Sequence, residues 1–138
     1  MYSHLLVTVA YEGEHDAARS LQVARALAAP RAKVTLIHVM EPAPLFTLNY
    51  LPDNWCEDMQ RAITADLGAL ASTFEDGRVV VTEGDPAHEV LDYAQENGVD
   101  CIVVASHRPG THSLMLGSTA AKIVGRALCA VHVARRED

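Results

Sequence analysis

The stretch Cys101–Arg126, CIVVASHRPGTHSLMLGSTAAKIVGR, decides the fold. Its first five residues (101–105) are all apolar, which is typical of a short strand buried on both faces of a parallel sheet. A loop with two glycines, a proline, an arginine and two histidines follows. Apolar residues then recur at helical spacing, which predicts a helix beginning near Ser118: Ala120, Ile123, Val124 and Ala127.

A strand, a glycine-rich loop and a helix start together form a geometry suited to an anion. The first amides of a helix have no partner inside the helix, and the helix dipole adds partial positive charge there. Gly117 would let a phosphate approach the backbone, and Ser118 and Thr119 would add hydroxyl groups. Arg108 would add a counter-charge. The alternative is that Gly117–Ser118 is only a turn and a helix cap. Because these residues share one loop after a buried strand, we expect a phosphate site.

Strand-like and helix-like segments alternate along the rest of the chain. Apolar strand patterns lie at 4–10, 33–39, 78–84 and 129–134, and helical patterns lie at 17–28, 53–74 and 85–98. We expect Pro30 to end the first helix, Asp76–Gly77 to form a turn, and Asp85–Pro86 to begin the third helix. The second helix carries a stripe that we expect to face the core: Trp55, Met59, Ile63, Leu67, Leu70 and Phe74.

This alternation predicts one α/β domain over residues 1–138, with a five-stranded parallel sheet and helices on both faces. Right-handed crossovers favour the flavodoxin-like strand order 3-2-1-4-5, with the strands numbered along the chain. Strands one and four are then neighbours where the winding reverses, and ligands bind in the crevice beyond their carboxyl ends. The loop before Ser118 leads into that crevice, so the topology and the loop composition indicate the same place.

Composition excludes several classes of partner and location. The 138 residues are 49% hydrophobic, and the formal net charge is −7 with no basic stripe, so nucleic acid and anionic membranes are poor partners. No apolar run reaches membrane-spanning length, and the N-terminus does not read as a signal peptide. Three widely spaced cysteines, Cys56, Cys101 and Cys129, indicate neither a disulfide framework nor a metal motif, which fits the cytoplasm.

The segment 41–52 is long for a loop in a compact domain and rich in apolar residues. Two interpretations stay open: the segment covers one end of the core, or it forms a lid or a partner surface.

The sequence carries no clear catalytic machinery. His107 and His112 share one loop, but no third ligand lies at useful spacing for a metal. GxSxG and P-loop motifs are absent, and no nucleophile stands beside a base, which argues against a hydrolase. Strand three ends in Thr82-Glu83-Gly84 and strand five runs into Arg135, which disfavours a phosphorelay receiver. We therefore predict no catalytic residues and no metal ligands.

Nearly the whole chain resembles a single-domain universal stress protein. The matching segments are EGDPAHEVLDYAQENGVDCIVVASHRPG, LMLGSTAAKIV and CAVHVAR. ATP-binding members of that family carry G-x2-G-x9-G-[ST] after strand four. Here Ala105 takes the place of the first glycine, ASHRP replaces GSHG, and the spacing to Gly117 is one residue shorter. This form resembles a branch of the family with the pattern ASHRP…LGS, in which nucleotide binding also occurs.

The resemblance implies an adenine-nucleotide-binding protein of the stress response, with ATP or ADP bound with or without Mg²⁺. The phosphates would lie on the Gly117 segment and the base near Val39 and strand four. The nucleotide-binding residues expected on this basis are Val39, Val104, Ala105, His107, Arg108, Gly110, Gly117, Ser118 and Thr119. Slow hydrolysis or autophosphorylation would follow only from the resemblance.

One departure concerns the end of strand one. ATP-binding members usually carry Pro-x-Asp there, whereas this chain has Thr8-Val9-Ala10. Losing the carboxylate should lower the affinity or relax the specificity for adenine nucleotides. It also favours a rival class, a non-nucleotide interaction module that acts through a dimer and the 41–52 loop.

A homodimer through strand five is expected in either case. In the order 3-2-1-4-5 this strand is an edge with unpaired backbone groups, and neither a proline nor an inward charge deters pairing. Antiparallel pairing with a second copy would satisfy both edges around a two-fold axis, and the family resemblance points to the same strand. The expected contacts are Val131, His132 and Val133.

Overall fold

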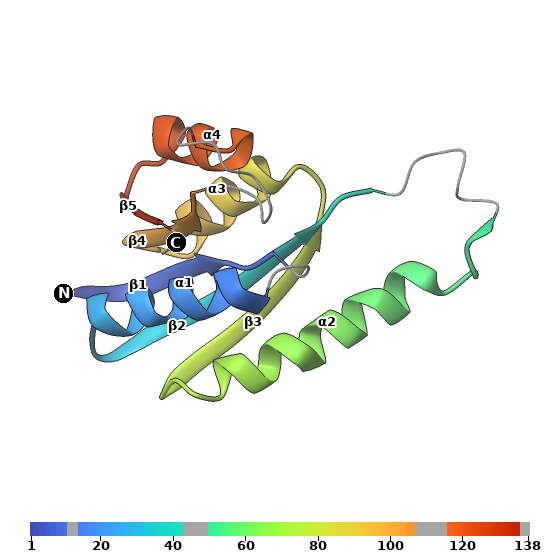
Figure 1. Ribbon diagram of the computed structural model, residues 1–138, viewed down its shortest axis with the longest axis horizontal. Coiled ribbons are helices and arrows are strands. Elements are labelled where there is room, and N and C mark those ends of the chain that lie inside the picture. Colours follow the sequence, from blue (N-terminus) through green and yellow to red (C-terminus); the bar gives the residue numbers. More distant parts are fainter. Residues whose placement is uncertain (11–13, 43–49, 107–115, 136–138) are drawn as a thin grey trace.

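A computed structural model describes residues 1–10, 14–42, 50–106 and 116–135. Strands and helices alternate from the first to the last: β1 (Tyr2–Thr8), α1 (Glu14–Leu27), β2 (Ala28–Met40), α2 (Trp55–Ala71), β3 (Asp76–Glu83), α3 (Pro86–Glu96), β4 (Cys101–Ala105), α4 (Ser118–Arg126) and β5 (Ala130–Ala134). The five strands form one parallel sheet in the order β3-β2-β1-β4-β5 (Figure 1). The predicted fold class and strand order are confirmed.

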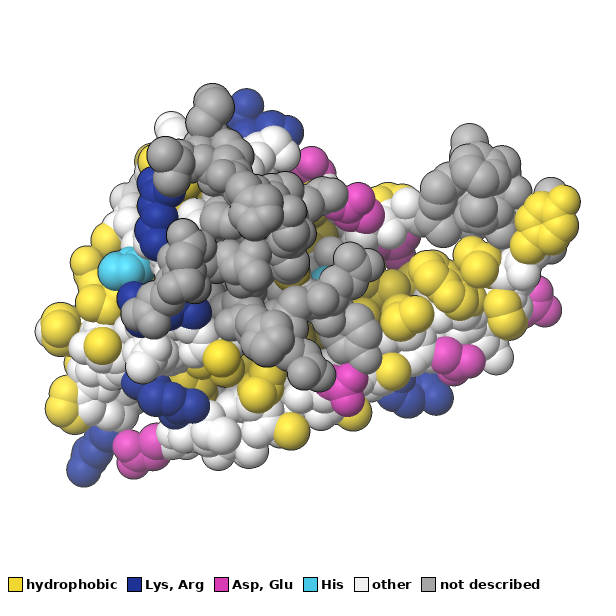
Figure 2. Space-filling view, viewed as in Figure 1, with side chains coloured by type: hydrophobic (Ala, Val, Ile, Leu, Met, Phe, Trp, Pro, Cys, Tyr) yellow, Lys and Arg dark blue, Asp and Glu magenta, His cyan; other side chains and the backbone are white. Residues whose placement is uncertain are grey.

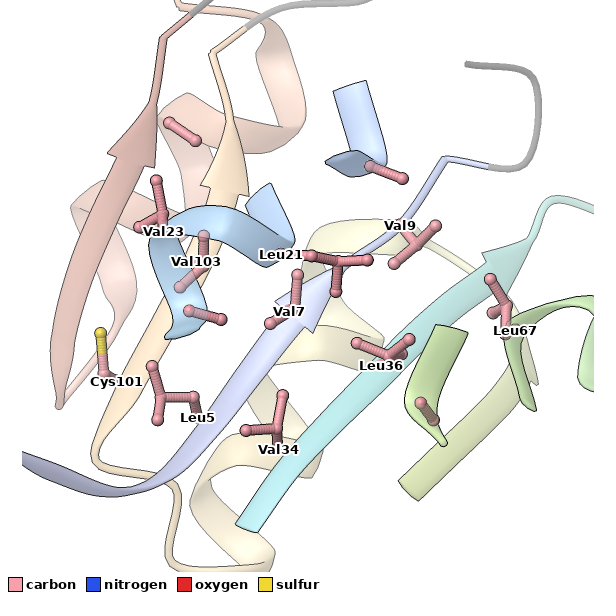
Figure 3. Close-up of a cluster of buried hydrophobic side chains, with 14 of the residues drawn as sticks. Leu5, Val7, Val9, Leu21, Val23, Val34, Leu36, Leu67, Cys101 and Val103 are labelled. Atoms are coloured by element: carbon pink, nitrogen blue, oxygen red, sulfur yellow. The ribbon is translucent and has the colours of Figure 1, made fainter. Parts of the chain in front are cut away.

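Two separate cores form because each strand is apolar on both faces. On one face, α1 and α2 cover side chains of β1, β2 and β4, and Figure 3 shows this cluster, with Leu5 and Val7 from β1 beside Val34 and Leu36 from β2. On the other face, α3 and α4 cover Leu6, Ile37 and Ile102. The first two helices thus cover one face and the last two the other, as right-handed crossovers require when the winding reverses between the neighbours β1 and β4.

The central pair of strands is the most deeply buried part of the molecule. Leu5 and Leu6 of β1 and Ile102 and Val103 of β4 are fully covered, and the register aligns Leu6 with Ile102. Burying a side chain of this kind contributes about 1.5–3 kcal/mol. The carboxyl ends of these two strands therefore stand on the best-packed part of the sheet.

β2 begins earlier than its apolar pattern predicts. It starts at Ala28, so Pro30 lies inside the strand rather than between a helix and a strand. Proline cannot donate a ladder hydrogen bond, and the following Arg31 has a positive φ of 65°. The register between β1 and β2 accordingly shifts between Tyr2 and His4.

β3 also begins earlier than predicted. Asp76 and Gly77 were expected to form a turn, but they pair with Lys33 and Val34 of β2. A turn motif chosen on residue type alone is overridden here because the β2 ladder offers partners for both residues.

α2 projects beyond the sheet at its N-terminal half (Figure 1). Ile63 and Leu67 are buried, as predicted, and Met59 is half-buried against the same core. Trp55 is half-buried and lies outside that core cluster, so the predicted stripe faces the core only from Met59 onward. Hydrophobic side chains reach the surface over α2 in Figure 2, although the large hydrophobic residues of this helix are half-buried or buried, and Tyr50 just before it is 87% exposed.

α3 has the boundaries that its cap residues predict. The Asp85 carboxylate accepts a hydrogen bond from the His88 amide at 3.0 Å, and Pro86 occupies the first helical position. At the other end Asn97 caps the helix, and Gly98 adopts a positive φ of 66°, a conformation that glycine takes at little cost.

A polar cluster fastens α3 to the amino ends of β1 and β2. His4, only 7% exposed, bonds through Nε2 to Thr35 Oγ1 at 2.9 Å and through Nδ1 to the Asn97 carbonyl at 3.2 Å. The Asp100 carboxylate accepts from the amides of Ser3 and His4 at 2.8 and 2.9 Å. These bonds lie at the amino-terminal end of the central strand β1, at the end of the sheet opposite the candidate site.

Among the described residues, no helix has the length and apolarity that a membrane span needs.

Candidate functional site

The candidate site lies at the carboxyl ends of β1 and β4, where the strand order reverses. Thr8 at the end of β1 contacts β4 through a hydrogen bond from its hydroxyl to the Val103 carbonyl, at 3.4 Å. Beyond this pair, β1 leads to α1 on one face of the sheet and β4 leads toward α4 on the other. α1 and α4 thus lie on opposite faces of the sheet, and such a switch point is where doubly wound proteins bind ligands.

The start of α4 is held at the end of β4 by one backbone hydrogen bond. The Gly117 amide donates to the Ser106 carbonyl at 2.8 Å, and the Gly117 carbonyl accepts from Ala121 to begin the helix. Gly117 is the N-cap, with φ −62° and ψ 162°, and as a glycine it offers no side chain to cap this end. The amides of the first turn have no partner within the helix, so this end of α4 can accept an anion.

Ser106 ties this end of the helix to the rest of the sheet. Its amide donates to the Ala134 carbonyl of β5 at 3.1 Å, while its carbonyl accepts from Gly117. The residue is 1% exposed. Sequence reasoning did not single out Ser106, because its role depends on backbone groups, which carry no side-chain signal.

Only some of the residues predicted to bind the phosphates lie among the described residues. Ser118 is exposed and Thr119 is half-buried in the first turn of α4, beside the half-buried Gly117. Three predicted residues, His107, Arg108 and Gly110, lie outside the described residues. The structure therefore brings Gly117, Ser118 and Thr119 together at the end of β4.

The residues predicted near the base occupy two strands. Val39 is half-buried at the end of β2 and packs against the core that contains Val104. Val104 is 1% exposed, so its backbone rather than its side chain could contact a ligand. Ala105 is half-buried at the end of β4, and Ala10, in the position of the family carboxylate, is exposed beyond β1.

Potential metal ligands lie elsewhere. Among the described residues, His88, Glu89 and Asp92 on α3 form one group whose ligand atoms all lie within 4.8 Å of one another. His88 and Asp92 are exposed and already paired, with Nε2 and Oδ2 3.0 Å apart. Exposed groups of this kind occur widely without an ion, so they do not define a metal centre.

The three cysteines are free, and their environments disfavour reactive thiolates. Burial raises the pKa of Cys101 to about 11, and burial also raises the pKa of Cys129. The Cys56 thiol donates a hydrogen bond to the Glu83 carboxylate at 3.0 Å, and this bond raises its pKa. A thiol is a nucleophile only as the thiolate, so none of these side chains is prepared for covalent catalysis.

Val131, His132 and Val133, predicted to form a dimer, lie on β5 at the edge of the sheet. Among the strands of the described residues, β5 pairs with β4 alone. Val131 and Val133 are half-buried and His132 is exposed.

A parallel sheet in this order, with an uncapped helix start at its switch point, defines a doubly wound α/β protein of the flavodoxin-like class. Residues 1–135 match the profile of the Universal stress protein family, and the chain belongs to that family.

Relatives that match over nearly their whole length support this assignment. The chain is 28% identical to the universal stress protein YxiE of Bacillus subtilis, over 98% of this chain and 100% of that protein. It is 31% identical to a universal stress protein of Thermus aquaticus, over 94% of this chain and 97% of the relative.

Solved structures share the fold. The hypothetical protein MJ0577 superposes with a TM-score of 0.83 at 20% identity, covering 100% of this chain and 99% of that one. A universal stress protein of Archaeoglobus fulgidus in complex with dAMP gives 0.67 at 18% identity, covering 96% and 97%. A universal stress protein in complex with cAMP gives 0.65 at 19% identity, covering 96% of each chain.

Proposed function

We propose that this chain is a universal stress protein that binds an adenine nucleotide, ATP or ADP with or without Mg²⁺, in the crevice between β1 and β4. One observation carries the proposal: the Gly117–Ser106 hydrogen bond of 2.8 Å holds the uncapped start of α4 at the end of β4. An anion there would be bound by free helix amides and by the partial charge of the helix dipole.

Two further points support a nucleotide rather than a simple anion. Val39 offers an apolar surface at the end of β2 for a base, close to the switch point. Structures of the same fold have been solved with dAMP and with cAMP. Arg108 and His107 would complete the phosphate side, and Gly110 would belong to the same loop. We infer further that the ASHRP…LGS pattern places the chain in the shorter-loop branch of the family, and that the protein acts in the cytoplasm.

The second candidate is a stress-related interaction module without a nucleotide. Ala10 favours it, because the family carboxylate is missing from the end of β1. The exposed Tyr50 and the hydrophobic side chains over α2 also suit contact with another protein (Figure 2).

Thermal unfolding with nucleotide separates the two candidates. A ligand of the native state at 100 times its Kd adds about 2.7 kcal/mol, which raises Tm by about 10 °C for a domain of this size. We expect such a shift with ATP or ADP at millimolar concentration, measured with and without Mg²⁺. The absence of any shift would favour the interaction module.

Gly117, the N-cap of α4, and Gly125, within α4, provide a matched pair of variants. Gly117→Val places a branched side chain at the helix start and should abolish the nucleotide-dependent shift. Gly125→Val makes the same change eight residues further along the chain, where an added Cβ meets nothing within 4 Å. That control should unfold at the same or a slightly higher temperature, because valine is a better helix former than glycine, and it should keep the shift. Equal shifts in both variants would place the phosphate site elsewhere.

A further inference from the structure

Both backbone groups of Val9, the first residue beyond β1, are engaged by β2. The Val9 amide donates to the Ile37 carbonyl at 2.9 Å, which continues the parallel ladder. The Val9 carbonyl lies 2.7 Å from Nδ1 of His38. A carbonyl can only accept, so Nδ1 carries the proton and the imidazole donates to Val9.

The imidazole occupies the place where the ladder would otherwise continue. Alternate residues of a parallel strand direct their backbone groups to the same neighbour, so Ile37 and Val39 both point theirs toward β1. In a longer ladder the Val39 amide would donate to the Val9 carbonyl. The last aligned pair is Thr8 with Ile37. Among the described residues, the Val9 carbonyl accepts a hydrogen bond from the His38 imidazole. It accepts none from the Val39 amide.

The position of His38 within β2 makes this contact possible. Leu36 and Met40, on the same face of the strand as His38, are buried in the core under α1 and α2. His38 itself is half-buried, at the level where β1 ends. The imidazole therefore contacts Val9, just beyond β1, while the side chains on either side of it on the same face, Leu36 and Met40, are held in the core.

We propose that His38 is a positioning residue of the candidate site. It ends the β1–β2 ladder at Thr8 and leaves the Val39 amide directed at the crevice instead of into the sheet. Its effect on a ligand rests on the proposed nucleotide function, since Val39 is where the base would lie. Without the imidazole, the Val9 carbonyl would be open to the Val39 amide, and the end of β1 would close against β2.

Amide exchange of two β2 residues tests the positioning role without any ligand. In His38→Leu, exchange of the Val39 amide, measured by NMR, should slow by about tenfold, the effect of a hydrogen bond of about 1.4 kcal/mol. In His38→Asn the side-chain amide can donate from nearly the position of Nδ1, so Val39 should exchange as in the wild type. The Leu36 amide, deep in the sheet, reports loss of stability in both variants.

These exchange results decide the role unambiguously. A variant that merely destabilises the fold would speed exchange at both Val39 and Leu36. Val39 exchange in His38→Leu that is unchanged or faster would overturn the proposal, and so would slow exchange in His38→Asn.

Nucleotide titration tests the consequence for the ligand. His38→Leu should weaken ATP or ADP binding by about tenfold, and His38→Asn should restore it. If the wild type binds neither nucleotide, the proposed function fails, while the exchange experiment still decides whether His38 positions the crevice. If His38→Leu shows the predicted exchange but binds nucleotide as tightly as the wild type, the link to the ligand is wrong.

Discussion

The imidazole of His4 and the hydroxyl of Thr35 share a buried hydrogen bond of 2.9 Å between Nε2 and Oγ1. The Asn97 carbonyl accepts from Nδ1, so in the neutral ring Nε2 must accept from Thr35. Burial lowers the pKa of His4, and Lys33 and Arg78 lower it further, against the opposing effects of the Asn97 carbonyl and Asp100. This cluster holds a neutral imidazole in place.

Acid should therefore weaken the folded state through His4. Because the folded pKa lies below 6.5, the unfolded chain binds the proton more readily. The contribution of His4 to stability is complete above pH 6.5 and is lost as the pH falls below that value. We expect the stability advantage of the wild type over His4→Gln, measured by urea unfolding, to shrink between pH 7.5 and pH 5. An advantage independent of pH would contradict this assignment.

The Cys56 thiol should react slowly because its hydrogen bond to the Glu83 carboxylate favours the protonated thiol over the thiolate. The 3.0 Å hydrogen bond to the carboxylate raises the thiol pKa. Glu83→Gln removes the negative charge, so the pKa should fall and alkylation of Cys56 by iodoacetamide at pH 8 should accelerate by a few-fold. Cys101, buried with a pKa of about 11, serves as the internal control and should stay slow in both proteins. Equal Cys56 rates would mean that the thiol does not depend on Glu83.

Gly77 is required by the close approach of α2 and β3. A Cβ added there would fall on the carbonyl of Ala71, the last residue of α2. Backbone cannot yield as a flexible side chain does, so Gly77→Ala should destabilise the protein by about 1–3 kcal/mol in urea unfolding. Gly68, within α2, has nothing within 4 Å of an added Cβ. Gly68→Ala should be neutral or stabilise by up to about 1 kcal/mol, and similar losses at both positions would refute the steric argument.

Restoring the family carboxylate should strengthen nucleotide binding. Ala10 is exposed beyond the end of β1, next to Val9, so Ala10→Asp should fit without repacking the core. A well-placed hydrogen bond contributes about 1 kcal/mol, or about fivefold in affinity. Calorimetry with ATP measures the change, and Ala10→Asn separates the carboxylate charge from its shape. Equal or weaker binding by Ala10→Asp would indicate a pocket rebuilt for another ligand.

The edge strand β5 should pair with a second copy. The Ala134 carbonyl points to β4, where it accepts from Ser106, so the alternating Val131 and Val133 direct their backbone groups to the open edge. Val133→Pro therefore removes an outward amide and spares the β4 ladder. Combined with Val131→Lys, it should yield folded monomer by light scattering.

A matched charge change lies on the surface of α4. Val124 is 45% exposed, so Val124→Lys should leave the dimer intact. A wild type that is monomeric at micromolar concentration, or a double variant that stays dimeric, would show that β5 is not the interface.

The sequence predicts most helix ends from local patterns, and it predicts the sheet order because right-handed crossovers leave few arrangements of five alternating strands. The apolar runs at 101–105 and 33–39 and the cap residue Asp85 identify their elements directly. Asp76–Gly77 was misread as a turn, since a neighbouring strand can pair with residues that usually stop one, whereas α1 ends before Pro30, which lies where the register between β1 and β2 shifts. Trp55 follows the helical period of α2, but period alone does not say how far the sheet beneath a helix extends.

The candidate site was predictable only where composition carries a signal. Gly117, Ser118 and Thr119 were identified because glycine and hydroxyls before a helix suit an anion. Ser106 and His38 act through a carbonyl and across two strands, at contacts that exist only once β1, β2, β4 and α4 are assembled. Such residues become visible from three-dimensional contacts.

The central position of β1 has a consequence for how the protein is made. β1 is synthesised first, yet one of its two neighbours, β4, is nearly 100 residues away along the chain: the contact between His4 and Asp100 spans 96 positions. While the ribosome is still translating the middle of the chain, β1 has β2 beside it and a row of unpaired backbone groups on its other side. Chaperones that shield exposed strands would meet that edge before the candidate site exists. Translation speed between residues 84 and 101 should therefore govern how much newly made protein aggregates.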